Sequence, residues 1–189
     1  MLPLILASSS LSRQNLLKRL GIPFESVSPD IDESMHANES AEQLVKRLSI
    51  EKAKAVATDH PNAIIIGSDQ LAVCNGDYLG KPLTHDNAVH QLSQASGNVV
   101  IFHSGLCVLN AHTNEYQVDD ITTQVEFRTL TTAEIEDYLS KEPAYHCAGS
   151  FKSEALGISL CHRMTSDDPS ALIGLPLIRL TQMLRATGY

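Results

Sequence analysis

The sequence has a shortage of basic residues and no long apolar run. Its 189 residues include 14 lysines and arginines against 22 aspartates and glutamates, which gives a formal net charge of −8 at pH 7. Proteins that wrap nucleic acids or adhere to anionic membranes depend on a surplus of lysine and arginine. No apolar stretch approaches the length that crosses a bilayer. The chain is therefore not expected to bind a nucleic-acid polymer or a membrane.

The sequence also lacks the marks of an exported or zinc-binding protein. No basic segment precedes the short apolar stretch at its start, so no signal peptide is expected. The four cysteines form no Cys-x-x-Cys pair, and none lies with histidines at the spacing of a zinc site. Their even number leaves disulfide bonds open. The simpler expectation is a cytoplasmic domain with reduced, buried thiols.

Several common catalytic motifs are absent as well. The chain has no Gly-x-Gly-x-x-Gly, no Walker-type phosphate loop and no Gly-x-Ser-x-Gly nucleophile elbow. Ser49 and Lys52 match the Ser-x-x-Lys spacing of penicillin-binding enzymes, but no Lys-Thr-Gly accompanies them. The histidines are scattered without ligand spacing. No single familiar motif therefore explains the chain.

Apolar periodicity predicts strands that alternate with helices. Strands are expected at residues 2–7, 24–28, 63–73, 99–109, 117–128 and near 158–162. Helices are expected at residues 11–20, 40–60, 84–95, 131–141 and 176–187. Two of these helices open with capping boxes, Ser40-x-x-Gln43 and Thr131-x-x-Glu134. The interleaving predicts an α/β fold with a mixed central sheet flanked by helices.

Lys52 interrupts the apolar face of the helix expected at residues 40–60. At about 100° per residue, it lies in the middle of the arc that includes Leu44 and Leu48. On the same spacing Arg47 points away from this arc, as a solvated charge does. A lysine in a buried stripe needs an anionic partner. The plainer alternatives are a side chain that reaches solvent and an ordinary internal salt bridge.

A second cation, Arg13, lies on the apolar side of the helix expected at residues 11–20. A cation in a first turn opposes the helix dipole. An anion bound at that N-terminus would compensate, because free backbone N–H groups and serine hydroxyls point there. Ser8 and Ser10 with Arg13 are therefore a candidate phosphate site on a strand-to-helix turn. The alternative is simple helix capping beside a surface arginine.

Asp69 breaks an isoleucine-rich strand that otherwise suits the core. A carboxylate at the end of such a strand is a candidate general base or metal ligand, and a turn or capping aspartate is the alternative. Asp32 and Glu33 in a preceding loop could join it in holding Mg²⁺, or could simply be solvated. Lys81 and Lys152 are loop cations that can reach either phosphate or water.

Together these segments resemble the Maf family of nucleoside-triphosphate pyrophosphatases. The resemblance runs from residue 3 to residue 186 through Leu6-Ala7-Ser8-Ser9-Ser10-Leu11-Ser12-Arg13, Asp32-Glu33, Glu51-Lys52-Ala53-Lys54, Gly67-Ser68-Asp69-Gln70, Gly80-Lys81-Pro82 and Ser96-Gly97. It implies one elongated domain, residues 1–189, of Maf/ITPase-like architecture with two lobes around a central cleft. It also implies hydrolysis of a modified nucleoside triphosphate to the monophosphate and pyrophosphate, with Mg²⁺ or Mn²⁺. Members of the family are often dimeric, which leaves a homodimer open.

Within the family, the chain resembles the branch that acts on 7-methyl-GTP. This resemblance lies in Gln70, in the segment His146–Glu154 and in Gly174–Leu177. The sequence departs from the usual pattern at three positions. Leu11 stands where the family usually has proline, Ser12 where the branch often has tryptophan, and Gln14 where a second arginine is common. The branches that act on dTTP, UTP or CTP are the alternative.

The resemblance also implies roles for individual residues. Asp69 corresponds to the family's proton acceptor, which would activate a water for attack on the α-phosphorus. The specificity positions correspond to Ser12, Gln70 and Glu154. The family's phosphate-binding positions are occupied by Ser8, Ser10, Arg13, Lys52 and Lys81, and its metal-binding positions by Glu33 and Asp69. Two alternatives from other classes are a nucleotide-binding regulator of cell division without catalysis and a phosphatase that removes the terminal phosphate.

Overall fold

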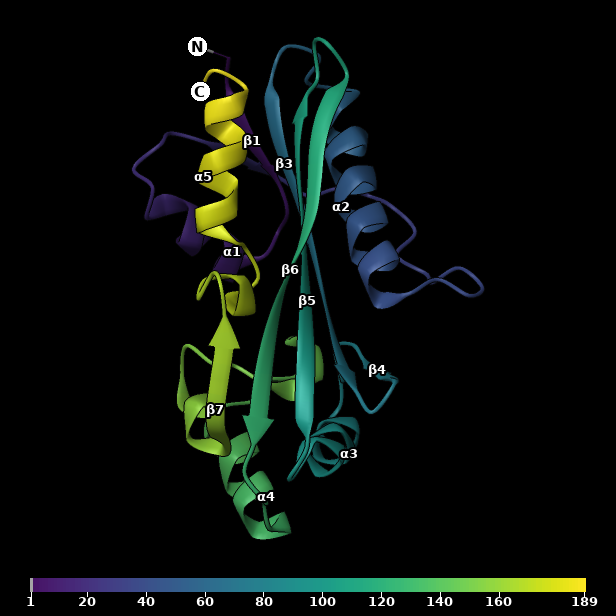
Figure 1. Cartoon of the computed structure of the whole chain (residues 1–189), viewed down its shortest axis with the longest axis vertical. Helices are drawn as coiled ribbons and strands as arrows, with labels where there is room; N and C mark the ends of the chain where they lie inside the picture. Colours follow the sequence, from purple (N-terminus) through teal and green to yellow (C-terminus); the bar gives the residue numbers. More distant parts are fainter. Residues whose placement is uncertain (1) are drawn as a thin grey trace. The chain divides into compact units, whose positions relative to one another are not determined.

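Residues 2–189 are described by a computed structural model, in which seven strands form a mixed sheet accompanied by five α-helices (Figure 1). The strand order is β2-β1-β3-β5-β6-β7, and β4 pairs with β3. The strands are β1 Leu4–Ala7, β2 Glu25–Val27, β3 Ile64–Cys74, β4 Asp77–Leu79, β5 Val99–Asn110, β6 Glu115–Phe127 and β7 Cys161–Ser166. The helices are α1 Leu11–Lys18, α2 Ala41–Ala57, α3 His85–Ala95, α4 Thr132–Lys141 and α5 Leu177–Ala186.

The predicted α/β class with a mixed sheet is confirmed. Strand β1 runs parallel to both β2 and β3, whereas β4 is antiparallel to β3 and β7 is antiparallel to β6. Both predicted capping boxes are present, at the N-termini of α2 and α4. They fix where these two helices begin, because each satisfies backbone N–H groups that have no partner within the helix.

Two strands differ from the sequence prediction. Strand β4 was not expected; it forms a hairpin with β3 through Asn75 and Gly76, both of which have positive φ. The strand expected near 158–162 lies at Cys161–Ser166 instead, because Leu156–Leu160 forms a 3-10 helix. Strand β7 is exposed on both faces, so it lacks the apolar alternation that reveals a strand in a sequence.

The chain divides into two units. Unit 1 comprises the residues up to Asp69 together with Ser104–Ile121 and Asp168–Tyr189, and unit 2 comprises Gln70–His103 and Thr122–Asp167. The strands β3, β5 and β6 contribute residues to both units. Since Asp69 ends one unit and Gln70 begins the other, the candidate site residues are divided between them.

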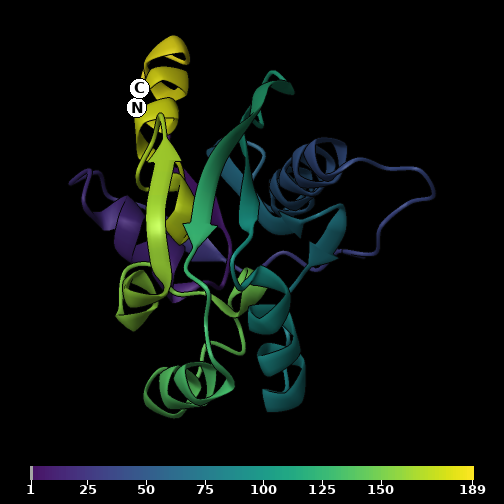
Figure 2. The same cartoon turned by 60° about the horizontal axis from the view of Figure 1, so that its bottom comes forward.

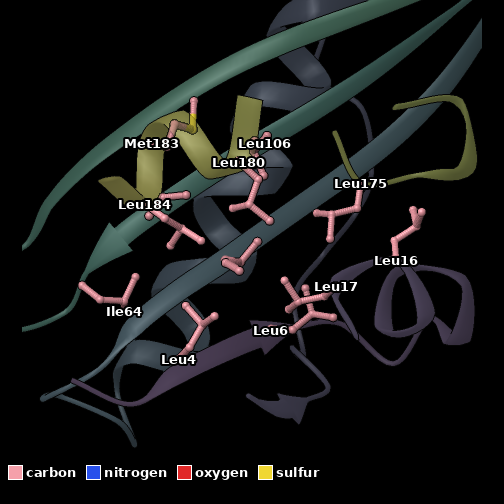
Figure 3. Close-up of a cluster of buried hydrophobic side chains, with 12 residues drawn as sticks. Leu4, Leu6, Leu16, Leu17, Ile64, Leu106, Leu175, Leu180, Met183 and Leu184 are labelled. Atoms are coloured by element: carbon pink, nitrogen blue, oxygen red, sulfur yellow. The ribbon is translucent and has the colours of Figure 1, made fainter. Parts of the chain in front are cut away.

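Both faces of β1 and of the first half of β3 are buried in unit 1. On one face, alternate residues of β1 and β3 contact leucines of α1 and α5 (Figure 3). The members of this cluster are Leu4, Leu6, Leu16, Leu17, Ile64, Ile66, Leu106, Val108, Leu175, Leu180, Met183 and Leu184. On the other face, Ile5, Ile65 and Cys107 contact Ala53 and Val56 of α2. A strand buried on both sides reads as a continuous apolar run, which is why β3 is rich in isoleucine.

Helix α2 lies unusually close to the sheet in unit 1. A Cβ added at Gly67 of β3 would collide with the carbonyl oxygen of Ser49, and one added at Gly105 of β5 would collide with that of Val45. Both acceptors are backbone atoms of α2, so they cannot move aside without moving the helix. The two glycines are therefore required for α2 to reach this position.

Unit 2 has its own core and two neighbouring helices, α3 and α4 (Figure 2). The Phe151 ring lies with its centroid 5.7 Å from that of Phe102 and 5.1 Å from that of Phe127. Among residues 2–189, no helix has both the length and the apolar character that crossing a membrane demands. The four cysteines, all within the described residues, are free; two are buried and two are half-buried.

We predict that Gly67→Ala destabilises the protein by about 3 kcal/mol, because the added methyl group meets helix backbone. For a domain of this size the loss corresponds to a melting temperature lower by roughly 6–12 °C in thermal unfolding. The matched control is Gly80→Ala, since a Cβ at Gly80 has no neighbour within 4 Å. This control should change stability by less than about 0.5 kcal/mol. Equal melting temperatures for the two variants would show that α2 does not lie this close.

Candidate active site

Lys52 is the centre of the candidate site in unit 1. Its side chain is only 6 % exposed, and Nζ lies 2.6 Å from Oδ1 of Asp69 and 2.8 Å from Oε1 of Glu33. The buried lysine therefore has two anionic partners, the carboxylates of Asp69 and Glu33. The interpretation of Lys52 as a side chain that reaches solvent is wrong, because the ammonium group is covered by these two carboxylates.

Asp69 meets Lys52 because of the alternation of β3. Residues Ile65, Gly67 and Asp69 share one face of the strand, and Ile65 contacts α2 on that face. Gly67 lets the helix approach, and Lys52 follows the contacting Ser49 by about one helical turn. The alternative of a turn or capping aspartate is wrong, since β3 continues past Asp69 to Cys74.

Arg13 and the serine segment lie at the N-terminus of α1. Arg13 donates from Nε to the carbonyl of Gly174 at 2.8 Å and from Nη1 to Oγ of Ser8 at 3.5 Å. Ser10 caps the helix, its Oγ accepting from the backbone N–H of Arg13 at 3.4 Å. The buried Ser8 hydroxyl also accepts from the N–H of Ser10. The alternative of helix capping is therefore correct for Ser10. Its second part, a surface arginine, does not describe Arg13, which is half-buried.

The charges of this part of unit 1 are coupled. Burial lowers the pKa of the Arg13 guanidinium below its ordinary value, and the negative charges of Asp69 and Glu33 oppose that shift. Among the described residues 2–189, the structure shows no ion pair between this half-buried guanidinium and a carboxylate, an environment that favours an anionic ligand. Arg13 therefore has the environment that a phosphate-binding arginine requires, beside a helix N-terminus.

The Gly174 carbonyl is a site feature that the sequence did not reveal. It accepts from Arg13 Nε and, at 3.0 Å, from Oγ of Ser68, the residue before Asp69. Its segment is held by Asp168, whose carboxylate accepts from the N–H of Ile178 at 2.7 Å and from the hydroxyl of Ser170 at 2.6 Å. The available signal was the Gly-x-Pro pattern at residues 174–176. Gly174 has a φ of 120°, which other residues rarely adopt.

In unit 2, Gln91 of α3 connects the segments that carry Lys81 and Glu154. The carbonyl of Gly80, next to Lys81, accepts from Nε2 of Gln91 at 3.1 Å and from the N–H of Gly149 at 3.2 Å. Oε1 of Gln91 accepts from the hydroxyl of Ser150 at 2.6 Å. Nothing in the sequence pattern distinguishes Gln91 from the other polar residues of its helix.

The remaining predicted site residues have varied environments. Ser12 on α1 and Gln70 on β3 are half-buried, whereas Lys81 and Glu154 are exposed. Lys152, which the sequence left open as a phosphate-binding or solvated cation, pairs with Glu142 at 2.7 Å. The structure thus brings together Ser8, Ser10, Arg13, Glu33, Lys52 and Asp69 in unit 1, and it places Gln70, Lys81 and Glu154 in unit 2.

Glu33 and Asp69 are the candidate metal ligands. Within residues 2–189, no group of three His, Cys, Asp or Glu side chains is arranged to hold a metal ion. Sites that bind Mg²⁺ with a nucleotide typically supply one or two carboxylates, and phosphates and waters complete the shell. The two carboxylates that converge on Lys52 fit such a shared ion, rather than one held by the protein alone.

Comparison with known proteins decides the family. The family described as Maf-like protein matches residues 3–187. The chain belongs to the Maf family. It is 56 % identical to the 7-methyl-GTP pyrophosphatase of Methylobacillus flagellatus, over 98 % of this chain and 97 % of that protein. It is 52 % identical to the protein of the same name from Nitrosococcus oceani, over 98 % and 94 % of the two chains. It is 54 % identical to the one from Pseudomonas fluorescens, over 100 % and 98 %.

For this Maf-family chain we predict that Gln91→Leu costs about 1–3 kcal/mol of stability, because the fully buried hydroxyl of Ser150 loses its acceptor. Ser150 also has a φ of 58°, a backbone conformation that depends on its surroundings. Chemical denaturation measures the effect. The control on the same helix is Gln94→Leu, since among residues 2–189 the Gln94 side chain is shown with a single hydrogen bond, an exposed one of 3.5 Å to Asp77. A Gln91 variant as stable as this control would refute the assigned hydrogen bond.

Proposed function

We propose that this protein hydrolyses 7-methyl-GTP to 7-methyl-GMP and pyrophosphate. The observation that carries the proposal is the pair of carboxylates, Asp69 and Glu33, held by the buried Lys52 in the unit that also contains Arg13 at a helix N-terminus. This arrangement combines a candidate base with cations for a triphosphate. Relatives that are 52–56 % identical over nearly their whole length carry the name of this activity, which supports the substrate.

Asp69 is the proposed base. Its Oδ1 accepts a hydrogen bond from Nζ of Lys52, which fixes the orientation of the carboxylate, and we assign Oδ2 to the attacking water. The water loses its proton to Asp69 as its oxygen forms a bond to the α-phosphorus. The bond from the α-phosphorus to the bridging oxygen breaks, and pyrophosphate leaves with that electron pair.

The cations of the site would stabilise the phosphate charge. Arg13 and Lys52 lie in unit 1, together with the backbone N–H groups at the start of α1 and the hydroxyls of Ser8 and Ser10. Lys81 in unit 2 is exposed, and among residues 2–189 the structure shows no carboxylate paired with it, so its ammonium group would be available to a phosphate. Such preorganised charges account for most of the catalysis in phosphoryl transfer.

Glu33 and Asp69 would hold Mg²⁺ or Mn²⁺ when the ion arrives with the triphosphate, and the ion would then neutralise negative charge on the phosphate oxygens. Lys52 already balances both carboxylates, at 2.8 and 2.6 Å. Its ammonium group would keep the two acids close together while no nucleotide is bound. The same lysine can then turn toward a phosphate oxygen.

The nucleobase of the substrate would be recognised by Gln70 and Glu154. An amide can donate to and accept from the edge of guanine, and a carboxylate is attracted to the positive charge of its methylated ring. Ser12 would supply a small hydroxyl at the third specificity position. The four free cysteines suit a reducing compartment, so we place the reaction in the cytoplasm.

The decisive experiment identifies the products formed from 7-methyl-GTP, GTP, dTTP, UTP and CTP. We expect 7-methyl-GTP to react fastest and to yield the monophosphate with pyrophosphate. Asp69→Asn should lower kcat by about 10²–10⁴-fold, the usual contribution of a general base. Asp59→Asn, the same change at an exposed residue of unit 1, should leave kcat unchanged.

Four results would each contradict part of the proposal. A diphosphate with inorganic phosphate would indicate a phosphatase of the terminal group. Nucleotide binding without any product would indicate a regulator, and faster turnover of dTTP, UTP or CTP would indicate another branch of the family. Undiminished turnover by Asp69→Asn would show that a different residue is the base.

A further inference from the structure

The loop between β2 and α2 brings Glu33 to the site without regular structure of its own. Residues 28–40, all of them described, contain no helix or strand, and the loop leads directly into α2 (Figure 1). The Glu33 side chain is 52 % exposed, yet its carboxylate lies 2.8 Å from Lys52. Holding an exposed side chain on such a loop costs conformational entropy. Other contacts must therefore fix the loop.

Arg47 of α2 makes those contacts. Its Nη2 donates to the carbonyl of Ser34, the residue after Glu33, at 3.0 Å. Its Nε and Nη2 also donate to the two carboxylate oxygens of Glu39 at 2.6 and 2.8 Å. This bidentate pair has the geometry of the strongest protein ion pairs. One guanidinium group thus binds the loop both beside Glu33 and near the loop's end.

The same guanidinium group is anchored to its own helix. Nη1 of Arg47 lies 3.0 Å from Oε2 of Glu51, one turn further along α2. Lys52 is the next residue of that helix. The loop that carries Glu33 is therefore fixed to the helical turn that carries the partner of Glu33. The Arg47 side chain is only 18 % exposed, so its interpretation as a solvated charge is wrong.

The loop folds around these contacts. Oδ1 of Asp32 accepts from the N–H of Ser34 at 2.9 Å, and Oε2 of Glu39 accepts from the N–H of His36 at 3.0 Å. The hydrogen bonds from Arg47 lower the pKa of Glu39 to about 2. Because this pKa is depressed, the pair contributes fully above the ordinary glutamate pKa of about 4.3 and is lost only as the pH falls through about 2. The contact is therefore intact at any physiological pH.

We propose that Arg47 is a positioning residue, which acts through Glu33 by fixing the loop of residues 32–39 to helix α2. Its place in the reaction rests on the proposed function, because Glu33 is the proposed metal ligand. A lysine could not replace it, since one ammonium group cannot bind the Ser34 carbonyl, both Glu39 oxygens and Glu51 in a fixed fork.

The first test measures the loop itself, independently of any activity. Amide hydrogen exchange of residues 32–39 should accelerate at least tenfold in Arg47→Ala and in Arg47→Lys, while α2 keeps its protection. Lys46→Ala is the matched control: Lys46 neighbours Arg47, pairs with Glu42 and touches no residue of the loop in any contact the structure shows. Unchanged exchange of the loop in both Arg47 variants would overturn the proposal.

The second test asks whether Arg47 acts through Glu33. In Arg47→Ala and Arg47→Lys, the Mg²⁺ concentration for half-maximal hydrolysis of 7-methyl-GTP should rise about 10–100-fold, as for other residues that support metal ligands. In a Glu33→Gln background, Arg47→Ala should cause no further loss. An equal loss in both backgrounds would overturn the proposal and show a general structural role. If the wild-type protein hydrolyses no nucleoside triphosphate, the proposed function fails, whereas the exchange measurement still decides the position of the loop.

Discussion

The close approach of α2 to the sheet is the constraint on which the site in unit 1 depends. Gly67 and Gly105 have no side chains, so the helix backbone lies directly on β3 and β5. A lysine at position 52 is then almost fully buried, and its charge needs anionic partners close to it. Asp69 lies two residues beyond Gly67 on the same face of β3 and supplies one charge. Glu33 supplies the other from the preceding loop.

Because side chains alternate along β3, the residue before Asp69 lies on the opposite face of the strand and has a different partner. Ser68 points away from α2 and donates to the carbonyl of Gly174, which also accepts from Arg13. A single strand thus presents the proposed base toward α2 and, on its other face, a hydroxyl that binds the Gly174 carbonyl, the acceptor of Arg13. The buried network of Asp168 and Ser170 holds the Gly174 segment in turn. Arg13 is therefore positioned by residues more than 150 positions away in the sequence.

Periodicity could predict the two cations of the site, but not the residues that hold them. Lys52 and Arg13 stand out because charges rarely fall on an apolar helical arc, and that signal is local. Arg47 lies off this arc, where the same reasoning expects a solvated charge, and only the fold of the loop at residues 32–39 encloses it. Gln91 binds the backbone carbonyl of a distant segment, which leaves no pattern in the sequence, and the signal for Gly174 was the short Gly-x-Pro pattern at residues 174–176. Strand β7 was misplaced because, as an edge strand exposed on both faces, it has no apolar alternation.

The proposed mechanism depends on attack of water at the α-phosphorus of the nucleotide. The most direct test is hydrolysis of 7-methyl-GTP by the wild-type protein in water enriched in ¹⁸O, with mass spectrometry of both products after a single turnover. If water attacks the α-phosphorus, one ¹⁸O atom enters 7-methyl-GMP and pyrophosphate stays unlabelled. Label in pyrophosphate would place the attack on the β-phosphorus and would refute the proposed mechanism.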